Sequence, residues 1–369
     1  MTDRRSELEQ AIRTNRGEPG PTLVYADWLQ ANGHPLGELI VLQHELAGAD
    51  DAAKRARADA IIAGLDLPEP RLATYGWRRG LWEWVRLENS VDWMDNGFDA
   101  LALAQRVFGA APCVALEELR IGILRWDYNH DDVPAVLAVA AACPWAPGVT
   151  RLHLGDVGED IDMSHHVIGA VGEAITAAFP NLVSLKLHSG DQTWNAPNTF
   201  ELAGLALPAL RELTIETCAL SKSRLQALFD GALPAVERLE LWFGSEEGSD
   251  VEYDDLAPLL AGDRFPRTRH LGLRNARFAG DIARGLAGTP IAARLESLDL
   301  SMGTLDDEPA GVLAAHAASF PALRRLVVND NFLEEGGLSA LRTAFAHAEV
   351  ISADQKAIEG DWRYVSVGE

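Results

Sequence analysis

The chain has 369 residues, of which 47% are hydrophobic, and a formal net charge of −23. So acidic a protein is a poor general binder of nucleic acid or anionic membrane, because both require a cationic surface. No apolar run reaches the roughly 18 residues that span a bilayer, and the first residues lack the apolar core of a signal peptide, so we expect a cytoplasmic protein with no nucleic-acid and no membrane partner.

The N-terminal part of the chain has the pattern of a small helical module. Ser6-x-x-Glu9 is a capping box that opens a first short helix, and Pro21 can start a second. A third helix is predicted over residues 37–46 and a fourth over residues 52–65. The module is too small to fold alone, so we expect it to dock on the first repeat and to cap it.

Two stretches of this module carry a family resemblance. They are Leu23-Val24-Tyr25-Ala26-Asp27-Trp28-Leu29-Gln30-Ala31-Asn32-Gly33 and Pro35-Leu36-Gly37-Glu38-Leu39-Ile40-x-Leu42-Gln43. With its Tyr-Ala-Asp-Trp-Leu core and Gly-Glu pair at this spacing, the module resembles the bacterial repeat-companion module. Thr22 and Leu36 stand where the family pattern has arginine, so any role of those arginines does not carry over. The resemblance implies a bacterial protein in which the module accompanies repeats, and it transfers no activity.

From Tyr75 onward the sequence repeats one phrase. Leu210-x-x-Leu213-x-Ile215-x-x-Cys218-x-Leu220 has close relatives that begin at Leu295 and Leu323. Apolar residues at positions 1, 4 and 6, with a small residue, Asn or Cys at position 9, are the leucine-rich-repeat signature. The residues at position 4, spaced by 26 to 34, are Val85, Leu119, Leu152, Leu185, Leu213, Leu239, Leu271, Leu298 and Leu326.

Such long spacings leave room for a helix between successive strands. Apolar residues recur at intervals of three and four over residues 133–142, 167–179, 222–229, 255–261, 310–320 and 337–347. The predicted fold class is α/β: a leucine-rich-repeat solenoid with a curved parallel sheet inside, helices outside and a small helical N-terminal cap module.

The predicted domains are a helical repeat-companion module (1–72), a solenoid of about nine long repeats (73–348) and a C-terminal cap with an edge strand (349–369). Residues 360–369 alternate in polarity and are rich in β-formers, which favours an edge strand that closes the last repeat. A terminal peptide read by another protein is the alternative. Loss of solubility on deletion of residues 362–369 would support the cap.

The sequence contains no organised catalytic or cofactor motif. The zincin, nucleophile-elbow, P-loop and dinucleotide-binding patterns are all missing. Cys218 and Asn331 occupy repeat position 9, where the side chain bonds the backbone of the turn. We therefore expect no enzyme, no cofactor and no small-molecule substrate.

Metal binding and disulfide bonding are also disfavoured. The pair His165-His166 lies near Asp160 and Asp162, but no further ligand has the spacing that defines a metal site. The three cysteines are widely separated and form neither a disulfide framework nor a zinc motif, which suits a reducing compartment. They are Cys113, Cys143 and Cys218.

The predicted concave face carries the candidate functional residues. Side chains along a strand alternate, so positions 3, 5 and 7 of each repeat face the inner curve. In the first four repeats, position 5 is Arg86, Arg120, His153 and Lys186, and no later repeat has a basic residue at this position. With positions 3 and 7 and one neighbouring aromatic residue, the candidate partner-binding residues are Trp84, Arg86, Arg120, Arg151, His153, Lys186, Arg238, Trp242, Phe243 and His270.

This face predicts a non-catalytic protein–protein interaction scaffold. Its basic residues would steer an acidic or extended segment of another protein, and Trp84, Trp242 and Phe243 would anchor that segment. A face of merely mixed charge is the alternative, because glutamates flank the basic residues. These are Glu83, Glu117, Glu118 and Glu237.

A second functional hypothesis is an inhibitor or immunity-type protein that masks a basic enzyme. Its contacts would be acidic residues of the same face, namely Glu216, Glu240, Asp299 and Asp330. The charge of the partner separates the two hypotheses, since a scaffold of the first kind binds an acidic segment and an inhibitor of the second kind binds a basic protein.

Overall fold

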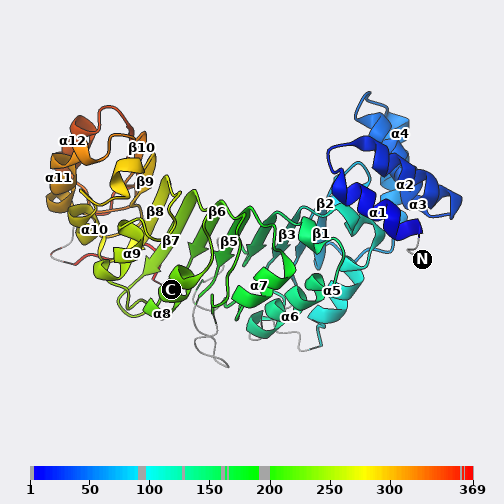
Figure 1. The fold of residues 1–369 in the computed structure, drawn as a ribbon, viewed down its shortest axis with the longest axis horizontal. Helices are drawn as coiled ribbons and strands as arrows, with labels where there is room; N and C mark the ends of the chain where they lie inside the picture. Colours follow the sequence, from blue (N-terminus) through cyan, green and yellow to red (C-terminus); the bar gives the residue numbers. More distant parts are fainter. Residues whose placement is uncertain are drawn as a thin grey trace. The chain divides into compact units, whose positions relative to one another are not determined.

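In the computed structural model, successive repeats each contribute one strand to a parallel sheet, with the connecting helices on one side of the strands (Figure 1). The structure describes residues 4–89, 97–126, 129–158, 163, 166–190, 200–357, 360 and 362–368. Contacts within the chain divide it into a first unit, Met1–Asp156 with Ala177–Asn181, and a second unit, Val157–Thr176 with Leu182–Glu369.

Four helices make up the N-terminal module of the first unit. They are α1 (Arg4–Thr14), α2 (Pro19–Ala31), α3 (Pro35–Leu46) and α4 (Ala52–Gly64). The capping box predicted at Ser6 is wrong, because α1 already includes Arg4 and Ser6 lies inside the helix. Proline occupies the first turn of α2 and α3, where its fixed φ suits a helix and its missing N–H is not needed.

The stretch that resembles the companion module builds the core of this module. Tyr25, Ala26 and Leu29 of α2 are at most 2% exposed. They share one buried cluster with Leu39 and Ile40 of α3. The apolar residues of the motif are therefore explained by packing between two helices.

Gly37→Ala is expected to destabilise the chain by about 2 kcal/mol, because α3 crosses α2 at this residue. A Cβ on Gly37 would lie 2.6 Å from the carbonyl oxygen of Ala26 and 2.8 Å from the backbone nitrogen of Gln30, and such overpacking typically costs about 1–3 kcal/mol. Chemical unfolding followed by circular dichroism measures the loss.

Gly20→Ala is the matched control on α2. Its Cβ would meet nothing within 4 Å, so the same added methyl group should leave stability unchanged or raise it by about 0.5 kcal/mol. Equal losses in the two variants would contradict the close approach of the helices at Gly37.

The first repeat opens with a hairpin, of which the sequence predicts only the second strand. β1 (Ala73–Arg78) pairs antiparallel with β2 (Leu81–Leu87). Gly80 turns the chain with φ +77°, and a Cβ there would lie 2.6 Å from Cγ1 of Ile40. The backbone N–H of Gly80 donates to Oε1 of Gln43 at 2.7 Å. Helix α3 thus rests on the hairpin, and the module is docked on the first repeat.

Two further repeats complete the first unit. Their elements are α5 (Ala100–Phe108), η1 (Ala111–Ala115), β3 (Glu118–Ile121), α6 (Asn129–Ala141), η3 (Ala146–Gly148) and β4 (Arg151–Leu154). The parallel register pairs Val85 with Leu119 and Leu119 with Leu152. Position 4 of one repeat therefore lies beside position 4 of the next.

The second unit continues the pattern with strands paired in sequence order. They are β5 (Ser184–His188), β6 (Glu212–Glu216), β7 (Arg238–Gly244), β8 (His270–Ala276), β9 (Ser297–Asp299), β10 (Arg325–Val327) and β11 (Glu349–Ile351). Leu213 pairs with Leu185 and Leu239, and Leu298 pairs with Leu271. These leucines are at most 1% exposed. The register confirms the leucine-rich-repeat alignment.

From β4 onward, helices connect the successive strands, and they lie on one side of the sheet (Figure 1). They are α7 (Gly172–Ala178), α8 (Lys222–Asp230), η5 (Tyr253–Leu256), α9 (Ala257–Leu260), α10 (Ala279–Gly285), η6 (Ala292–Arg294), α11 (Asp307–Ala315), η7 (Ala317–Ser319) and α12 (Glu335–Ala344). The sequence does not predict α10. The helix predicted from residue 167 begins only at Gly172.

The described part of residues 360–369 does not form the predicted edge strand. The place beside β10 belongs to β11. Residues 362–368, which we call segment 362–368, instead pass the carboxyl ends of β8 and β9, where the backbone N–H of Ser366 donates to the carbonyl of Met302 at 3.0 Å.

Among the helices of the described ranges, none combines the length and the apolar character needed to cross a bilayer.

Candidate protein-binding surface

The face of the sheet opposite the helices, which carries positions 3, 5 and 7, is called the open face below. In the first unit its basic residues are paired with carboxylates. Nε of Arg86 donates to Oδ2 of Asp156 at 2.8 Å, and Arg86 also pairs with Glu88. Nδ1 of His153 lies 3.6 Å from Oδ1 of the same Asp156. The charge of Arg86 is thus already balanced within the chain.

Two further arginines of this face share one carboxylate, that of Glu118. Nε of Arg151 lies 2.8 Å from Oε2 of Glu118, and Arg120 pairs with Oε1. Burial raises the pKa of Glu118, but the hydrogen bonds from Arg120 and Arg151 outweigh it and hold the pKa below its usual value. The guanidinium of Arg120 also lies 5.2 Å from the ring centroid of Trp84.

Lys186 repeats this arrangement in the second unit. Its Nζ lies 2.8 Å from Oε1 of Glu216, while Nδ1 of His188 lies 3.0 Å from Oε2. Burial raises the pKa of Glu216, and the hydrogen bonds from His188 and Lys186 bring it below its usual value. Each basic residue at position 5 of these repeats thus has a carboxylate beside it, which favours the alternative of a face of mixed charge.

Two adjacent aromatic residues of β7 face opposite sides of the sheet. Phe243 is fully buried and packs edge-on against Phe278 at 5.0 Å between ring centroids. The prediction that Phe243 contacts a partner is wrong, since alternation along the strand turns it toward the core. Trp242 lies on the open face, where its Nε1 donates to Glu240 at 2.8 Å and Arg274 lies 4.8 Å from its ring centroid.

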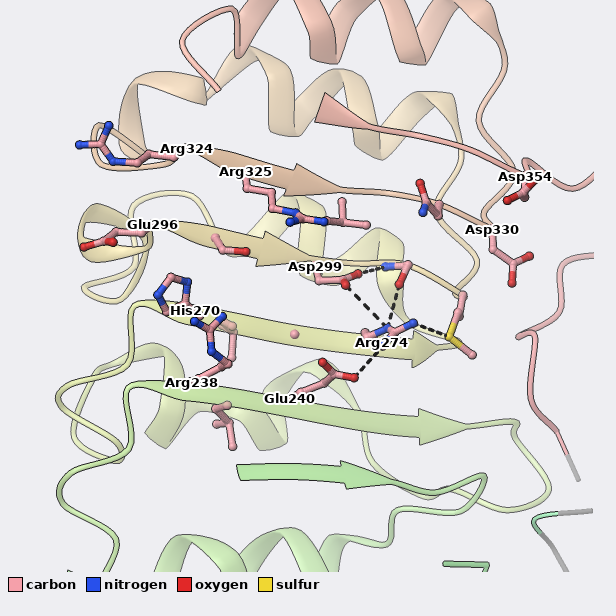
Figure 2. Close-up of a pocket in the computed structure, with 18 residues that line it drawn as sticks. Arg238, Glu240, His270, Arg274, Glu296, Asp299, Arg324, Arg325, Asp330 and Asp354 are labelled. Atoms are coloured by element: carbon pink, nitrogen blue, oxygen red, sulfur yellow. Dashed lines mark hydrogen bonds and ion pairs between the residues drawn. The ribbon is translucent and has the colours of Figure 1, made fainter. Parts of the chain in front are cut away.

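The open face of the second unit is hollowed from β7 to beyond β10 (Figure 2). The hollow has a volume of about 780 Å³, and Gly272 and Val327 line it. Gly272 occupies position 5 between Glu240 and Asp299 on the neighbouring strands. Because glycine has no side chain, β8 carries none at the point where the other two strands carry carboxylates, and the side chain of Glu240 lies against the buried Gly272.

Arg274 organises the polar groups in the middle of this hollow (Figure 2). Its Nη1 lies 2.8 Å from Oε1 of Glu240, and its Nε lies 3.8 Å from Oδ2 of Asp299. The same Nε donates to Oγ of Ser301 at 2.9 Å. One cation thus stands between two carboxylates. Sequence reasoning missed Arg274, although its place at position 7 beside Trp242 was a signal that could have found it.

Two exposed arginines lie at the amino ends of the strands that line the hollow. Arg325 is exposed and forms no ion pair or side-chain hydrogen bond with any residue of the described ranges. Arg238 has a side chain 55% exposed, and its nearest carboxylate, Glu212, is 3.8 Å away. Burial and then the charge of Arg238 lower the pKa of His270, so its imidazole is neutral near pH 7. Arg325 stands at position 3, outside the predicted set.

Carboxylates lie at the opposite end of the hollow. Figure 2 shows Asp330 and Asp354 at the carboxyl ends of the strands, away from Arg238 and Arg325. Asp330 is 3.5 Å from Nζ of Lys356. Cations therefore predominate at the amino ends of the strands, where Glu296 also lies and pairs with Arg269, and carboxylates lie at the carboxyl ends (Figure 2).

Among the described residues, no three His, Cys, Asp or Glu side chains are gathered so that they could hold a metal ion. The predicted loop residues His165, Asp160 and Asp162 lie outside the described ranges. Burial raises the pKa of the Cys113 thiol well above its usual value, which keeps this thiol in its unreactive form near pH 7.

No family model matches the chain, and no curated protein matches its sequence significantly. The fold is similar to the crystal structure of a protein from Bacteroides fragilis, with a TM-score of 0.60 and 20% identity over 72% of each chain. A TLR13–ssRNA13 complex is similar over 67% of this chain and 30% of the other, with 14% identity and a TM-score of 0.37. The resemblance of residues 23–43 to the companion module stays a prediction. The strand register identifies the chain as a leucine-rich-repeat solenoid.

Proposed function

We propose that the chain is a non-catalytic protein-binding scaffold and that the hollow of the second unit holds an extended segment of a partner protein. The observation that carries this proposal is the pair Arg238 and Arg325 at one end of the hollow. Arg86, Arg120, Arg151 and Lys186 have closer carboxylate partners, whereas Arg325 has none in the described ranges and Arg238 has only Glu212, at 3.8 Å.

The polarity of the hollow selects a segment of mixed charge. A carboxylate of the partner would meet Arg238 and Arg325, and a cation would meet the exposed Asp354, because Asp330 already lies 3.5 Å from Nζ of Lys356. Because the chain carries a net charge of −23, a purely acidic partner would be repelled at long range. Complementary charges at both ends fix the direction of the segment and raise the association rate. Trp242 lies outside the lining of the hollow and acts on it through Arg274, which lies 4.8 Å from its ring centroid.

Arg238→Glu with Arg325→Glu is expected to weaken this binding at least about ten-fold, which corresponds to about 1.4 kcal/mol. Random decapeptides displayed on phage would be selected on the unmodified chain. The affinities of the selected peptides for the variant would then be measured by fluorescence anisotropy at low and high salt. The loss should shrink as salt screens the charges.

Arg264→Glu with Arg267→Glu is the matched control. These two arginines are exposed and lie outside the hollow, so this variant makes the same change in net charge at another place. Equal weakening by both variants would mean that binding follows total charge and that the hollow is not the site. Selected peptides that lack any carboxylate would contradict the role of Arg238 and Arg325.

The ion pairs of the open face support the inhibitor hypothesis less well than the scaffold hypothesis. Glu216 is engaged by Lys186 and His188, and Arg274 engages both Glu240 and Asp299. A basic enzyme would have to displace these cations before it could use the carboxylates. A captured partner with a large positive charge would reverse this preference.

The cytoplasmic location, the bacterial origin and the domain boundaries at residues 72 and 348 remain proposals.

A further inference from the structure

Segment 362–368 is held by its backbone, in the manner of a bound extended peptide. The backbone N–H of Ser366 donates to the carbonyl of Met302 at 3.0 Å. Nζ of Lys356 donates to the carbonyl of Tyr364 at 3.2 Å. These bonds reach the segment from loops that follow different strands, so the segment lies across the repeats and belongs to none of them.

Asn275 makes the most specific of these contacts. The backbone N–H of Val367 donates to Oδ1 of Asn275 at 2.9 Å, and Nδ2 of Asn275 donates to the carbonyl of Val367 at 2.6 Å. Asn275 is 0% exposed and has a φ of 54°, a left-handed conformation that asparagine tolerates better than most residues. The segment itself contributes to the burial of Asn275, because both polar groups of this side chain take their partner from the main chain of Val367.

The side chains of the segment alternate between the repeats and solvent. Val365 is 8% exposed, and Val367 packs on a small cluster that includes Cys218 and Ala219. Between them Ser366 is exposed. Alternate side chains in pockets and hydrogen bonds to the main chain are the two elements by which proteins recognise extended peptides.

The inward positions also define the preferred sequence of an occupant. Nη2 of Arg363 lies 3.8 Å from Oδ2 of Asp306, and its guanidinium lies 5.1 Å from the ring centroid of Phe332. Counting from this residue, every second position faces the repeats: a cation, then Val365, then Val367. The pattern of a fitting peptide is therefore cation-x-aliphatic-x-aliphatic.

We propose that the surface under segment 362–368 is a peptide-binding site for an extended partner segment of this pattern, and that the chain's own segment occupies the site in cis. The site is distinct from the hollow proposed above, and Met302 borders both. A partner segment of this pattern competes with the chain's own segment for Asn275.

The test uses two pieces of the same sequence: a chain of residues 1–359, and a fluorescent peptide of residues 360–369. The peptide is expected to bind the shortened chain saturably and at least about ten-fold more tightly than it binds the full chain, where the site is filled. Fluorescence anisotropy measures both affinities, and circular dichroism shows whether the shortened chain is folded.

Neighbouring substitutions in the peptide provide a matched control that leaves the protein unchanged. Val367→Asp places a charge in the apolar cluster and should weaken binding at least about ten-fold. Ser366→Asp adds the same charge one position away, at an exposed residue whose hydroxyl donates to the carbonyl of Met302 at 3.2 Å, and should weaken binding clearly less than Val367→Asp does. On the protein side, Asn275→Asp in the shortened chain keeps the acceptor for Val367 but removes the donor, and should weaken binding at least about ten-fold.

The outcomes decide the proposal in either direction. Saturable binding of the peptide to a folded shortened chain supports the site. A shortened chain that is unfolded alone and regains its structure with the peptide shows that the segment is part of the fold, and this result overturns the proposal. A folded shortened chain that shows no saturation up to about 1 mM peptide overturns it. An unfolded shortened chain that the peptide does not restore also overturns it, because the segment is then only a structural cap. Equal effects of Val367→Asp and Ser366→Asp would refute the register.

Discussion

Leu213→Asp is expected to unfold the second unit. Leu213 is 0% exposed at position 4 of β6, with Leu185 and Leu239 beside it in the register. Removing a buried leucine side chain costs about 2–5 kcal/mol, and an unpaired buried carboxylate adds several kcal/mol more. The sum approaches the whole stability of a typical domain, about 5–15 kcal/mol. Thermal unfolding followed by circular dichroism should show the loss of a transition.

Thr214→Asp tests whether the position or the charge is responsible. Thr214 is the next residue of β6 and faces the open side, where it pairs with Lys186 and Glu240 in the register. The same carboxylate there remains in contact with water and should cost about 1 kcal/mol or less. An unchanged melting temperature in Leu213→Asp would refute the repeat assignment at this position, and unfolding by Thr214→Asp would refute the assignment of the faces.

Asn331→Ala is expected to cost about 3 kcal/mol in the free energy of unfolding. Asn331 is fully buried at repeat position 9. Its Oδ1 accepts from the backbone N–H of Leu305 at 3.0 Å, and its Nδ2 donates to the carbonyl oxygens of Leu300 and Val328 at 2.9 and 3.2 Å. Alanine leaves these buried backbone groups unpaired, at about 1–3 kcal/mol for each group. Urea unfolding measures the change.

Asn329→Ala serves as the comparison, because it removes a half-exposed asparagine side chain two residues earlier. Oδ1 of Asn329 accepts from the backbone N–H of Ala353 at 2.7 Å, and its side chain is half exposed. Water can replace such a bond, so the cost should be about 1 kcal/mol. Similar losses in the two variants would show that position 9 has no special role in linking neighbouring repeats.

The fold could be predicted because one local pattern determines it. An apolar residue at position 4 is buried whichever repeat it belongs to, so the spacing from Leu185 to Leu326 already contains the register that the strands adopt. Some short helices and strands were not predicted, because they have too few residues to show a hydrophobic period. Helix α10 spans only Ala279–Gly285, with a glycine at its second and last positions, and β1 has Gly76 in the middle of its pattern.

The candidate surface could be predicted only as a set of positions. Alternation along each strand placed Trp242 and Arg238 on the open face, and the same rule should have turned Phe243 inward. The charge state of the face depends on contacts that cross repeats. Arg86 reaches a residue 70 positions away, and Lys186 and Glu216 meet only when β5 and β6 are paired. No linear pattern reveals that Arg325 is left without such a partner.

Segment 362–368 has a consequence for how the second unit folds. In a solenoid each repeat touches only its neighbours, so unfolding can start at an end and proceed one repeat at a time. The bond between Asn275 and Val367 joins residues 92 positions apart and encloses the repeats of β9, β10 and β11. Closing so long a loop is entropically costly, so this contact should form last. Once formed, it ties the enclosed repeats into one cooperative block, in which the amide hydrogens of β10 should exchange as slowly as those of β8.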